Sequence, residues 1–276
     1  MDINDSDTLL GVATDLRDVL VRSRYQFYIS YPTNDLPQKA GSGFIIQHRD
    51  RLFLITAGHV VRVPGKDEKY PHEKEKIPTI PYYFVAKRTE DNVIGSVSMP
   101  LPKFDHFDKE NKEPFDMSFC ELTTDNVKLP LIIGEDIPFS DGYIVKAGSS
   151  RIIFQDGCGC SPSKDSMYFV FGNIQAQMTK TTFEGTNVDA VNQIVTLKEG
   201  LKYKEIQDEY IVLETEEKEI PLKKDWAGLS GSPVIDDNGY LLGVLSSISK
   251  VDNTVFVIGY DCIIKKIEER IFSEQP

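Results

Sequence analysis

The chain has 276 residues, of which 40% are hydrophobic and 27% are charged, and its formal net charge is −12. This size and composition allow a large buried core and predict one or two domains. The negative charge argues against a nucleic-acid partner, because phosphate binding requires a basic surface. No apolar run reaches the roughly 18 residues of a membrane span, so we expect no membrane partner.

The N-terminal region is predicted to form a helix over residues 6–22, capped at Ser6 or Asp7, with its apolar residues on one face. Met1 is followed by acidic residues instead of a basic and apolar leader, so we expect no secretory signal. The four cysteines show neither a secreted disulfide framework nor the spacing of a metal site. Together these features predict a reduced, cytoplasmic protein without a bound metal.

Runs of β-branched and aromatic residues, separated by Gly, Asn and Asp turns, predict strands along most of the chain. They indicate an all-β barrel or sandwich. The predicted strands span residues 25–31, 44–47, 52–56, 82–87, 93–97, 167–171, 192–197, 210–214, 240–247 and 254–258. A second helix is predicted over residues 261–272, with isoleucines along one face.

The runs 44–47 and 52–56 are separated by a polar tetrad, which predicts a hairpin. His59 follows the second run at a turn of small residues. A histidine held where a buried strand ends can face a cleft. The unperturbed pKa of histidine, about 6.5, suits it to take and return a proton at neutral pH. A histidine in such a position is more often an ordinary loop residue, so His59 gains meaning only together with other residues.

Asp116 is the acid that we expect beside this histidine. It stands at the entry of a predicted strand whose apolar residues alternate. A carboxylate there could accept a hydrogen bond from the imidazole, set its tautomer and stabilise the imidazolium. Asp105 and Asp108 are alternatives, but they lie in the charged stretch 103–113, which we predict to be a solvated loop.

Ser230 lies in a turn flanked by glycines. A serine hydroxyl becomes a nucleophile when a base removes its proton and N–H groups hold the developing oxyanion. All four histidines precede Ser230, which excludes the chain order in which histidine follows serine. The order Asp, His, Ser would need an acid before His59, and Asp35 and Asp50 both lie in polar, loop-like contexts. The order His, Asp, Ser remains.

Three motifs in this order, Thr56-Ala-Gly-His59, Phe115-Asp-Met-Ser-Phe119 and Gly228-Leu-Ser-Gly-Ser-Pro233, resemble those of trypsin-like (chymotrypsin-fold) serine peptidases. The compact bacterial and intracellular branch is the most similar. The resemblance covers residues 25–262. It implies two antiparallel six-stranded β-barrels, with the active site in the cleft between them.

The resemblance implies a serine endopeptidase that acts on a protein or peptide substrate and needs no cofactor. His59 would be the base, Asp116 its orienting acid and Ser230 the nucleophile. The N–H groups of Gly228 and Ser230 would form the oxyanion hole. A non-catalytic trypsin-like module that binds a partner protein is the alternative function.

The resemblance also divides the chain. Residues 1–23 would be an N-terminal helix, residues 24–130 the first barrel, and residues 131–276 the connector, the second barrel and the C-terminal helix. Proteins of this compact kind occur in bacterial defence and signalling systems, antiviral ones included, where a sensor controls them. A regulated effector with a regulatory or sensor partner is therefore a hypothesis from analogy.

The predicted strand over residues 243–247 resembles the strand that pairs with the substrate backbone in this family. Ser246, Ser247 and Ile248 are therefore candidate substrate-binding residues. Ile248 stands where the family often has glycine, which would narrow the specificity pocket.

Lys224, six residues before the nucleophile, would lie at the base of that pocket, with Asp225 beside it. If Lys224 points inward, the pocket would prefer acidic side chains; if Asp225 does, it would prefer basic ones. The third reading has both residues facing solvent.

Two departures from the family are clear. Leu229 replaces the Asp or Asn that usually precedes the nucleophile, so activation through an ion pair with a freshly cut N-terminus is not expected. Ser42 and Gly58 lie where secreted members carry the cysteines of a disulfide.

Overall fold

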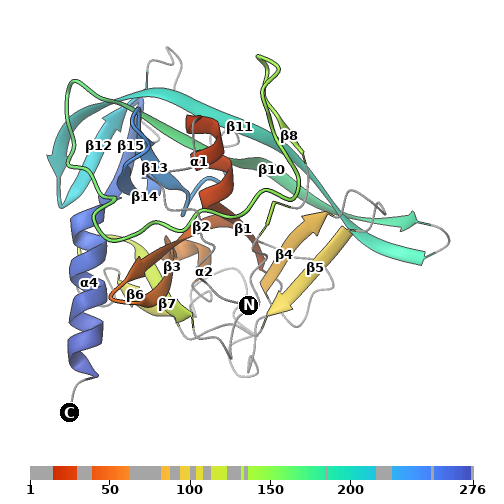
Figure 1. The fold of residues 1–276 in the computed structure, drawn as a ribbon, viewed down its shortest axis with the longest axis horizontal. Helices are drawn as coiled ribbons and strands as arrows, with labels where there is room; N and C mark the ends of the chain where they lie inside the picture. Colours follow the sequence, from red (N-terminus) through yellow and green to blue (C-terminus); the bar gives the residue numbers. More distant parts are fainter. Residues whose placement is uncertain are drawn as a thin grey trace.

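The computed structural model describes residues 15–29, 39–61, 82–87, 94–99, 104–107, 113–122, 132–133, 136–183, 186–215, 226–249 and 252–274. Within these residues the chain consists mostly of antiparallel strands, with a helix near each end (Figure 1). The predicted all-β class with terminal helices is confirmed.

One antiparallel sheet contains seven described strands in the order β5-β4-β1-β2-β3-β7-β6, where the resemblance implies six. Its strands are β1 (Arg24–Ile29), β2 (Lys39–His48), β3 (Arg51–Ala57), β4 (Tyr82–Lys87), β5 (Ile94–Met99), β6 (Asp105–Phe107) and β7 (Met117–Leu122). The predicted hairpin is present as β2–β3. Its two-residue turn is formed by Arg49 and Asp50, whose φ angles are 49° and 61°. Two positive φ angles give such a turn the same twist as the strands that it joins.

The second sheet is a closed six-stranded barrel, as predicted, in the order β10-β11-β12-β15-β14-β13. Its strands are β10 (Met167–Phe183), β11 (Thr186–Gln207), β12 (Tyr210–Glu214), β13 (Pro233–Asp236), β14 (Leu241–Ile248) and β15 (Thr254–Gly259). The predicted strands over residues 210–214, 240–247 and 254–258 coincide with β12, β14 and β15 to within a residue at each end.

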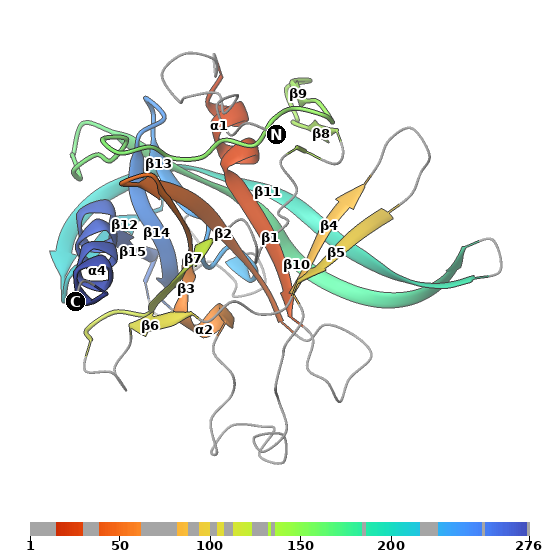
Figure 2. The same cartoon turned by 60° about the horizontal axis from the view of Figure 1, so that its bottom comes forward.

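Strands β10 and β11 are much longer than the runs predicted for them. They have 17 and 22 residues and pair as one ribbon from Met167 and Lys202 to Phe183 and Thr186. The ribbon projects beyond the barrel in both views (Figures 1 and 2). Within the described residues, β13 pairs with β10 only from Tyr168 to Val170, near the base of the ribbon.

Helix α1 (Leu16–Ser23) precedes β1 directly. Asp15 is its N-cap: the backbone of Asp15 is extended, and its carboxylate accepts a hydrogen bond from the amide of Arg17 at 2.8 Å. The predicted helix over residues 6–22 therefore does not run through Asp15. The caps predicted at Ser6 and Asp7 lie outside the described residues.

Helix α4 (Tyr260–Ser273) buries Ile263, Ile267 and Ile271 on one face, as its isoleucine spacing predicts. Its charged face meets the first half of the molecule, where Arg270 pairs with Asp105 of β6 at 3.0 Å and Lys266 pairs with Glu113, before β7, at 2.8 Å. No helix among the described residues has the length and apolar character needed to cross a bilayer.

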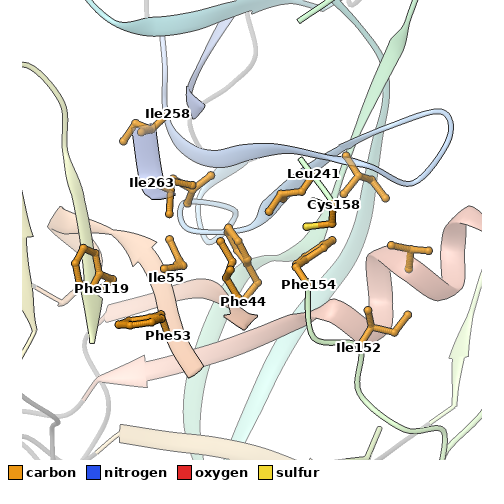
Figure 3. Close-up of a cluster of buried hydrophobic side chains, with 14 of the residues drawn as sticks. Phe44, Phe53, Ile55, Phe119, Ile152, Phe154, Cys158, Leu241, Ile258 and Ile263 are labelled. Carbon is orange, nitrogen blue, oxygen red and sulfur yellow. The ribbon is translucent and has the colours of Figure 1, made fainter. Parts of the chain in front are cut away.

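One hydrophobic core fills the space between the two sheets and the helices. The close-up in Figure 3 shows Phe44, Phe53, Ile55 and Phe119 of the first sheet on one side of it and Leu241, Ile258 and Ile263 on the other. Phe154, from the segment that joins the sheets, packs edge-on against Phe44 with ring centroids 5.6 Å apart. The core is therefore shared by both halves of the molecule.

The segment between the sheets is hydrogen-bonded to each of them. Residues 137–145 form the short pair β8 (Ile137–Pro138) and β9 (Ile144–Val145). Phe154 then exchanges backbone hydrogen bonds with the first sheet, and Cys158 accepts one from Leu241 of the barrel at 2.9 Å. The connector thus ties the two sheets together.

Candidate active site

His59 and Asp116 are brought together by the pairing of β3 with β7. Ala57, at the end of β3, lies opposite Met117, at the start of β7. His59 is therefore two residues beyond one strand end, in the short helix α2 (Gly58–Val61), and Asp116 is one residue before the other.

The carboxylate of Asp116 holds the imidazole of His59. Its Oδ2 lies 2.6 Å from His59 Nδ1 and also accepts the backbone amide of His59 at 3.2 Å. Because a carboxylate only accepts hydrogen bonds, Nδ1 carries the hydrogen and Nε2 presents its lone pair. The side chain of His59 as a whole is 50% exposed.

Gly58 sits directly against Asp116. A Cβ at position 58 would overlap Oδ1 of the carboxylate. Glycine is therefore the residue that lets the histidine turn close onto its acid. The Gly58 amide adds a hydrogen bond to the Asp116 carbonyl at 3.3 Å.

Tyr210, in β12 of the barrel, contacts the same acid from the other half of the molecule. Its hydroxyl oxygen accepts the amide of Asp116 at 3.0 Å and is also hydrogen-bonded to Ser246. Burial raises the pKa of the Tyr210 phenol, so the hydroxyl keeps its proton. This bond joins the barrel to the His59–Asp116 pair.

Residues 226–232 form a tight turn, named the serine loop below, which carries Ser230. Gly228 and Gly231 have φ angles of 108° and 87°, a region that favours glycine. A Cβ on Gly231 would overlap the carbonyl oxygen of Ser42 in β2. The loop therefore lies against the first sheet with no room for a side chain at position 231.

The peptide group between Gly228 and Leu229 is hydrogen-bonded at both ends. The Ser42 hydroxyl donates to the Gly228 carbonyl at 2.9 Å. The Leu229 amide donates to the carbonyl of Trp226 at 3.1 Å. This peptide plane cannot rotate without breaking both bonds.

The peptide group between Ser230 and Gly231 is held in the same way. The amide of Ser42 donates to the Ser230 carbonyl at 2.8 Å, and the Gly231 amide donates to Leu245 at 2.8 Å. Ser42 therefore donates to the carbonyl oxygens of both neighbours of Leu229, namely Gly228 and Ser230.

The amides of Gly228 and Ser230 belong to the alternate peptide groups. Neither donates a hydrogen bond to any residue that the structure describes. The Ser230 hydroxyl likewise has no hydrogen-bond partner within the described ranges. An oxyanion hole needs two such N–H donors beside the nucleophile, so these two amides stay the candidates for it.

Leu229 points away from the surface into the barrel. It is fully buried with Trp226, Val170 and Leu213 in the core inside the barrel. The residue that precedes the serine is therefore held by apolar packing.

The alternative acids and the pocket residues are placed as follows. The carboxylate of Asp105 pairs with Arg270 of α4 at 3.0 Å, whereas that of Asp116 pairs with His59. Asp108, Lys224 and Asp225 lie outside the described residues.

The three candidate residues on β14 differ in their surroundings. Ser246 is 1% exposed and its hydroxyl bonds Tyr210, so its side chain lies beneath the surface. Ser247 is exposed and pairs with Phe256 across the sheet. Ile248 is half-buried against the barrel core. Of the three side chains, those of Ser247 and Ile248 are accessible to a ligand.

Tyr210, Ser42 and Arg24 are site residues that sequence reasoning missed. Arg24, at the start of β1, is 6% exposed and donates from Nε to the Ser42 hydroxyl at 2.9 Å. The one available signal was Ser42, a hydroxyl where related secreted proteins carry a cysteine. The described residues contain no group of three or more His, Cys, Asp or Glu side chains that could hold a metal ion.

The fold has the two antiparallel β-sheets, one of them a closed barrel, that the resemblance to trypsin-like serine peptidases implies. His59 and Asp116 meet where β3 ends and β7 begins, and Ser230 lies in a turn between two glycines with positive φ. No family model and no curated protein matches the sequence.

Among solved structures, the chain is similar to a serine endoprotease from Yersinia pestis, with 14% identity, 95% of this chain and 68% of that chain covered, and a TM-score of 0.45. It is also similar to the MamO protease domain from Magnetospirillum magneticum, with 12% identity, 90% and 97% covered, and a TM-score of 0.40. At these identities no activity passes from either protein to this one, and the residue geometry above has to carry any functional conclusion.

Proposed function

We propose that the protein is a serine endopeptidase with His59 as base, Asp116 as orienting acid and Ser230 as nucleophile. The observation that carries this proposal is the 2.6 Å contact between His59 Nδ1 and Asp116 Oδ2, which assigns Nδ1 to the acid and makes Nε2 the basic nitrogen of the neutral ring. Hydrogen bonds connect the serine loop to the hairpin that precedes this histidine. The Ser42 amide donates to the Ser230 carbonyl, and the Thr56 hydroxyl donates to the Ser42 carbonyl at 2.7 Å.

In the proposed reaction, Ser230 Oγ attacks the carbonyl carbon of a peptide bond while His59 Nε2 takes the hydroxyl proton. Asp116 stabilises the imidazolium that forms. The amides of Gly228 and Ser230 donate to the oxyanion of the tetrahedral intermediate. When this intermediate collapses, His59 returns the proton to the leaving amine, and the acyl group stays on Ser230.

Hydrolysis of the acyl-enzyme repeats these roles with water as the nucleophile. His59 takes a proton from the water, and Ser230 leaves with that proton. The hydrogen bond between Ser230 and His59 would form in the substrate complex, as catalytic hydrogen bonds often tighten only then. The substrate would be a protein or peptide segment.

A fluorophosphonate probe tests this proposal, because it reacts with a serine only when base and oxyanion donors activate it. The purified full chain should be labelled, and Ser230→Ala and His59→Ala should each abolish labelling and casein cleavage. Ser140→Ala, which changes an exposed serine in the connector, is the matched control and should be labelled like the parent.

Two results would contradict the proposal. Labelling that persists in Ser230→Ala would show that another residue reacts. A folded parent that neither reacts with the probe nor cleaves casein would support the binding-module alternative.

A further inference from the structure

The serine loop is held from the first sheet by one buried residue, Ser42, which is 0% exposed. All three of its polar groups are used. Its amide donates to Ser230, its hydroxyl donates to Gly228, and its carbonyl accepts from Thr56.

Arg24 fixes the direction of the Ser42 hydroxyl. A hydroxyl has one hydrogen to donate, and a guanidinium only donates. Because Arg24 Nε donates to Ser42 Oγ at 2.9 Å, the hydroxyl hydrogen is directed to the Gly228 carbonyl, also at 2.9 Å. The arrangement is thus a one-way chain of donors from Arg24 through Ser42 to Gly228.

Arg24 itself is confined by the barrel. Its guanidinium carbon lies 5.8 Å from the centroid of the Phe171 ring. A Cβ on Gly172, the next residue, would lie 3.2 Å from Arg24 Nε and would overlap Leu229. Arg24 therefore touches the strand against which the serine loop packs, with little freedom to turn elsewhere.

The Gly228 amide needs such support because glycine rotates easily. A carbonyl held at Gly228 fixes the following peptide plane, so the preceding N–H can move only by rotation about the φ and ψ bonds of Gly228. The buried guanidinium of Arg24 is the first donor in this series of hydrogen bonds. It strengthens both its own bond to Ser42 and the bond from Ser42 to Gly228, because charge-assisted hydrogen bonds polarise their neighbours.

We propose that Arg24 and Ser42 are positioning residues for the oxyanion hole. They act in place of the ion pair that digestive members of the resembled family form after N-terminal cleavage. This inference rests on the proposed peptidase function. It predicts that the oxyanion hole is functional without N-terminal cleavage. Apolar packing of Leu229 would hold the serine loop on one side and the Arg24–Ser42 pair on the other.

The kinetic test uses Ser42→Ala and Arg24→Lys in the full chain, with active sites counted by fluorophosphonate titration. Each variant should lower kcat per titrated site about tenfold and leave KM within about twofold, because the lost bond acts on the transition state. The matched controls are Ser23→Ala, a buried serine whose hydroxyl has no hydrogen-bond partner among the described residues, and Arg22→Lys, whose arginine donates to the connector at Ser150.

The two controls should keep the parent kcat. A purely structural role for Ser42 would reduce the number of titrated sites and leave kcat per site unchanged, and that outcome would overturn the proposal. Equal losses in Arg24→Lys and Arg22→Lys would overturn the assignment of Arg24.

A second measurement tests the inference without relying on enzyme activity. Hydrogen exchange of the serine loop should be at least about tenfold faster in Ser42→Ala than in the parent, because the peptide groups around Leu229 lose a restraint. Unchanged exchange would contradict the inference even if the protein is a peptidase. If the parent fails to react with the probe, the proposed function fails, and faster exchange in Ser42→Ala would still show that Ser42 restrains the loop.

Discussion

Position 58 has room for a hydrogen atom and nothing larger, because the Asp116 carboxylate lies where a Cβ would be. The same carboxylate holds both the ring and the backbone amide of His59. A methyl group at position 58 would therefore displace the Asp116 carboxylate and change the orientation of the imidazole that it holds.

We expect Gly58→Ala to lower kcat/KM about 100-fold, since a displacement of about 1 Å in a catalytic group can cost that much. The melting temperature should change little more than in Gly200→Ala, a control glycine with φ of 71° and open space around it. Peptide hydrolysis and thermal melting of both variants are the measurements. Parent-like activity in Gly58→Ala would mean that Asp116 does not need its present position.

Tyr210 offers a milder change at the same acid. Tyr210→Phe removes the acceptor of the Asp116 amide and should lower kcat about fivefold to tenfold with KM unchanged, the magnitude of one lost hydrogen bond. Tyr240→Phe, at an exposed tyrosine, is the control. A rise in KM without a fall in kcat would assign Tyr210 to substrate binding instead.

The candidate residues that could be predicted from sequence are those whose chemistry shows in a short motif. His59 follows a strand at a turn of small residues, and Ser230 has glycines on both sides. Tyr210 and Arg24 have no such local signal, because their role comes from contacts with residues 94 and 18 positions away. Only the folded structure reveals them: Arg24 contacts Ser42 across two neighbouring strands, and Tyr210 contacts Asp116 from the other half.

At the level of elements, the strands that were predicted well are short apolar runs that the barrel buries. In β12 and β15 the apolar residues are paired and buried within the barrel, so the sequence pattern matches the boundaries. The ribbon of β10 and β11 was underestimated because the two strands stay paired well past the barrel, to Phe183 and Thr186, whereas the predicted runs cover only residues 167–171 and 192–197. Its length is set by pairing between the two strands.

Helix α4 is the element that most clearly serves both halves. Ile267 is fully buried in the shared core, so Ile267→Ala should lower the free energy of unfolding by about 3 kcal/mol, within the range for such a cavity. Ile264→Ala, on the half-buried flank, should cost clearly less. Urea unfolding of both variants measures this. Equal losses would show that the core does not depend on the isoleucine face identified here.

At the scale of the whole molecule, burial of thiols and a phenol makes the fold sensitive to alkali. Burial raises the pKa of Cys158 and Cys160 to about 12, of Cys262 to about 11 and of Tyr25 to about 12. An unfolded thiol loses its proton near pH 8.5, so above that pH the unfolded chain binds fewer protons than the folded one. The stabilisation is complete below this point and is lost as pH rises through the folded values.

We therefore expect the free energy of unfolding to fall steadily from about pH 9 towards pH 12. Urea titrations at a series of pH values measure it, and Cys158→Ala, which removes one of these thiols, should show a shallower fall than the parent. A free energy that stays flat over this range would show that these groups titrate alike in the folded and unfolded chains.

The division of the chain at residues 130 and 131 stays a prediction, because residues 123–131 lie outside the described part. The connector that follows, however, exchanges backbone hydrogen bonds with both sheets, and Phe154 packs within the core that they share. The barrel has a core of its own, but the other core is built from residues of both halves. A fragment cut out at that boundary would expose a broad apolar face, so the protein should melt in a single cooperative step, and its two halves should not survive as separate soluble pieces.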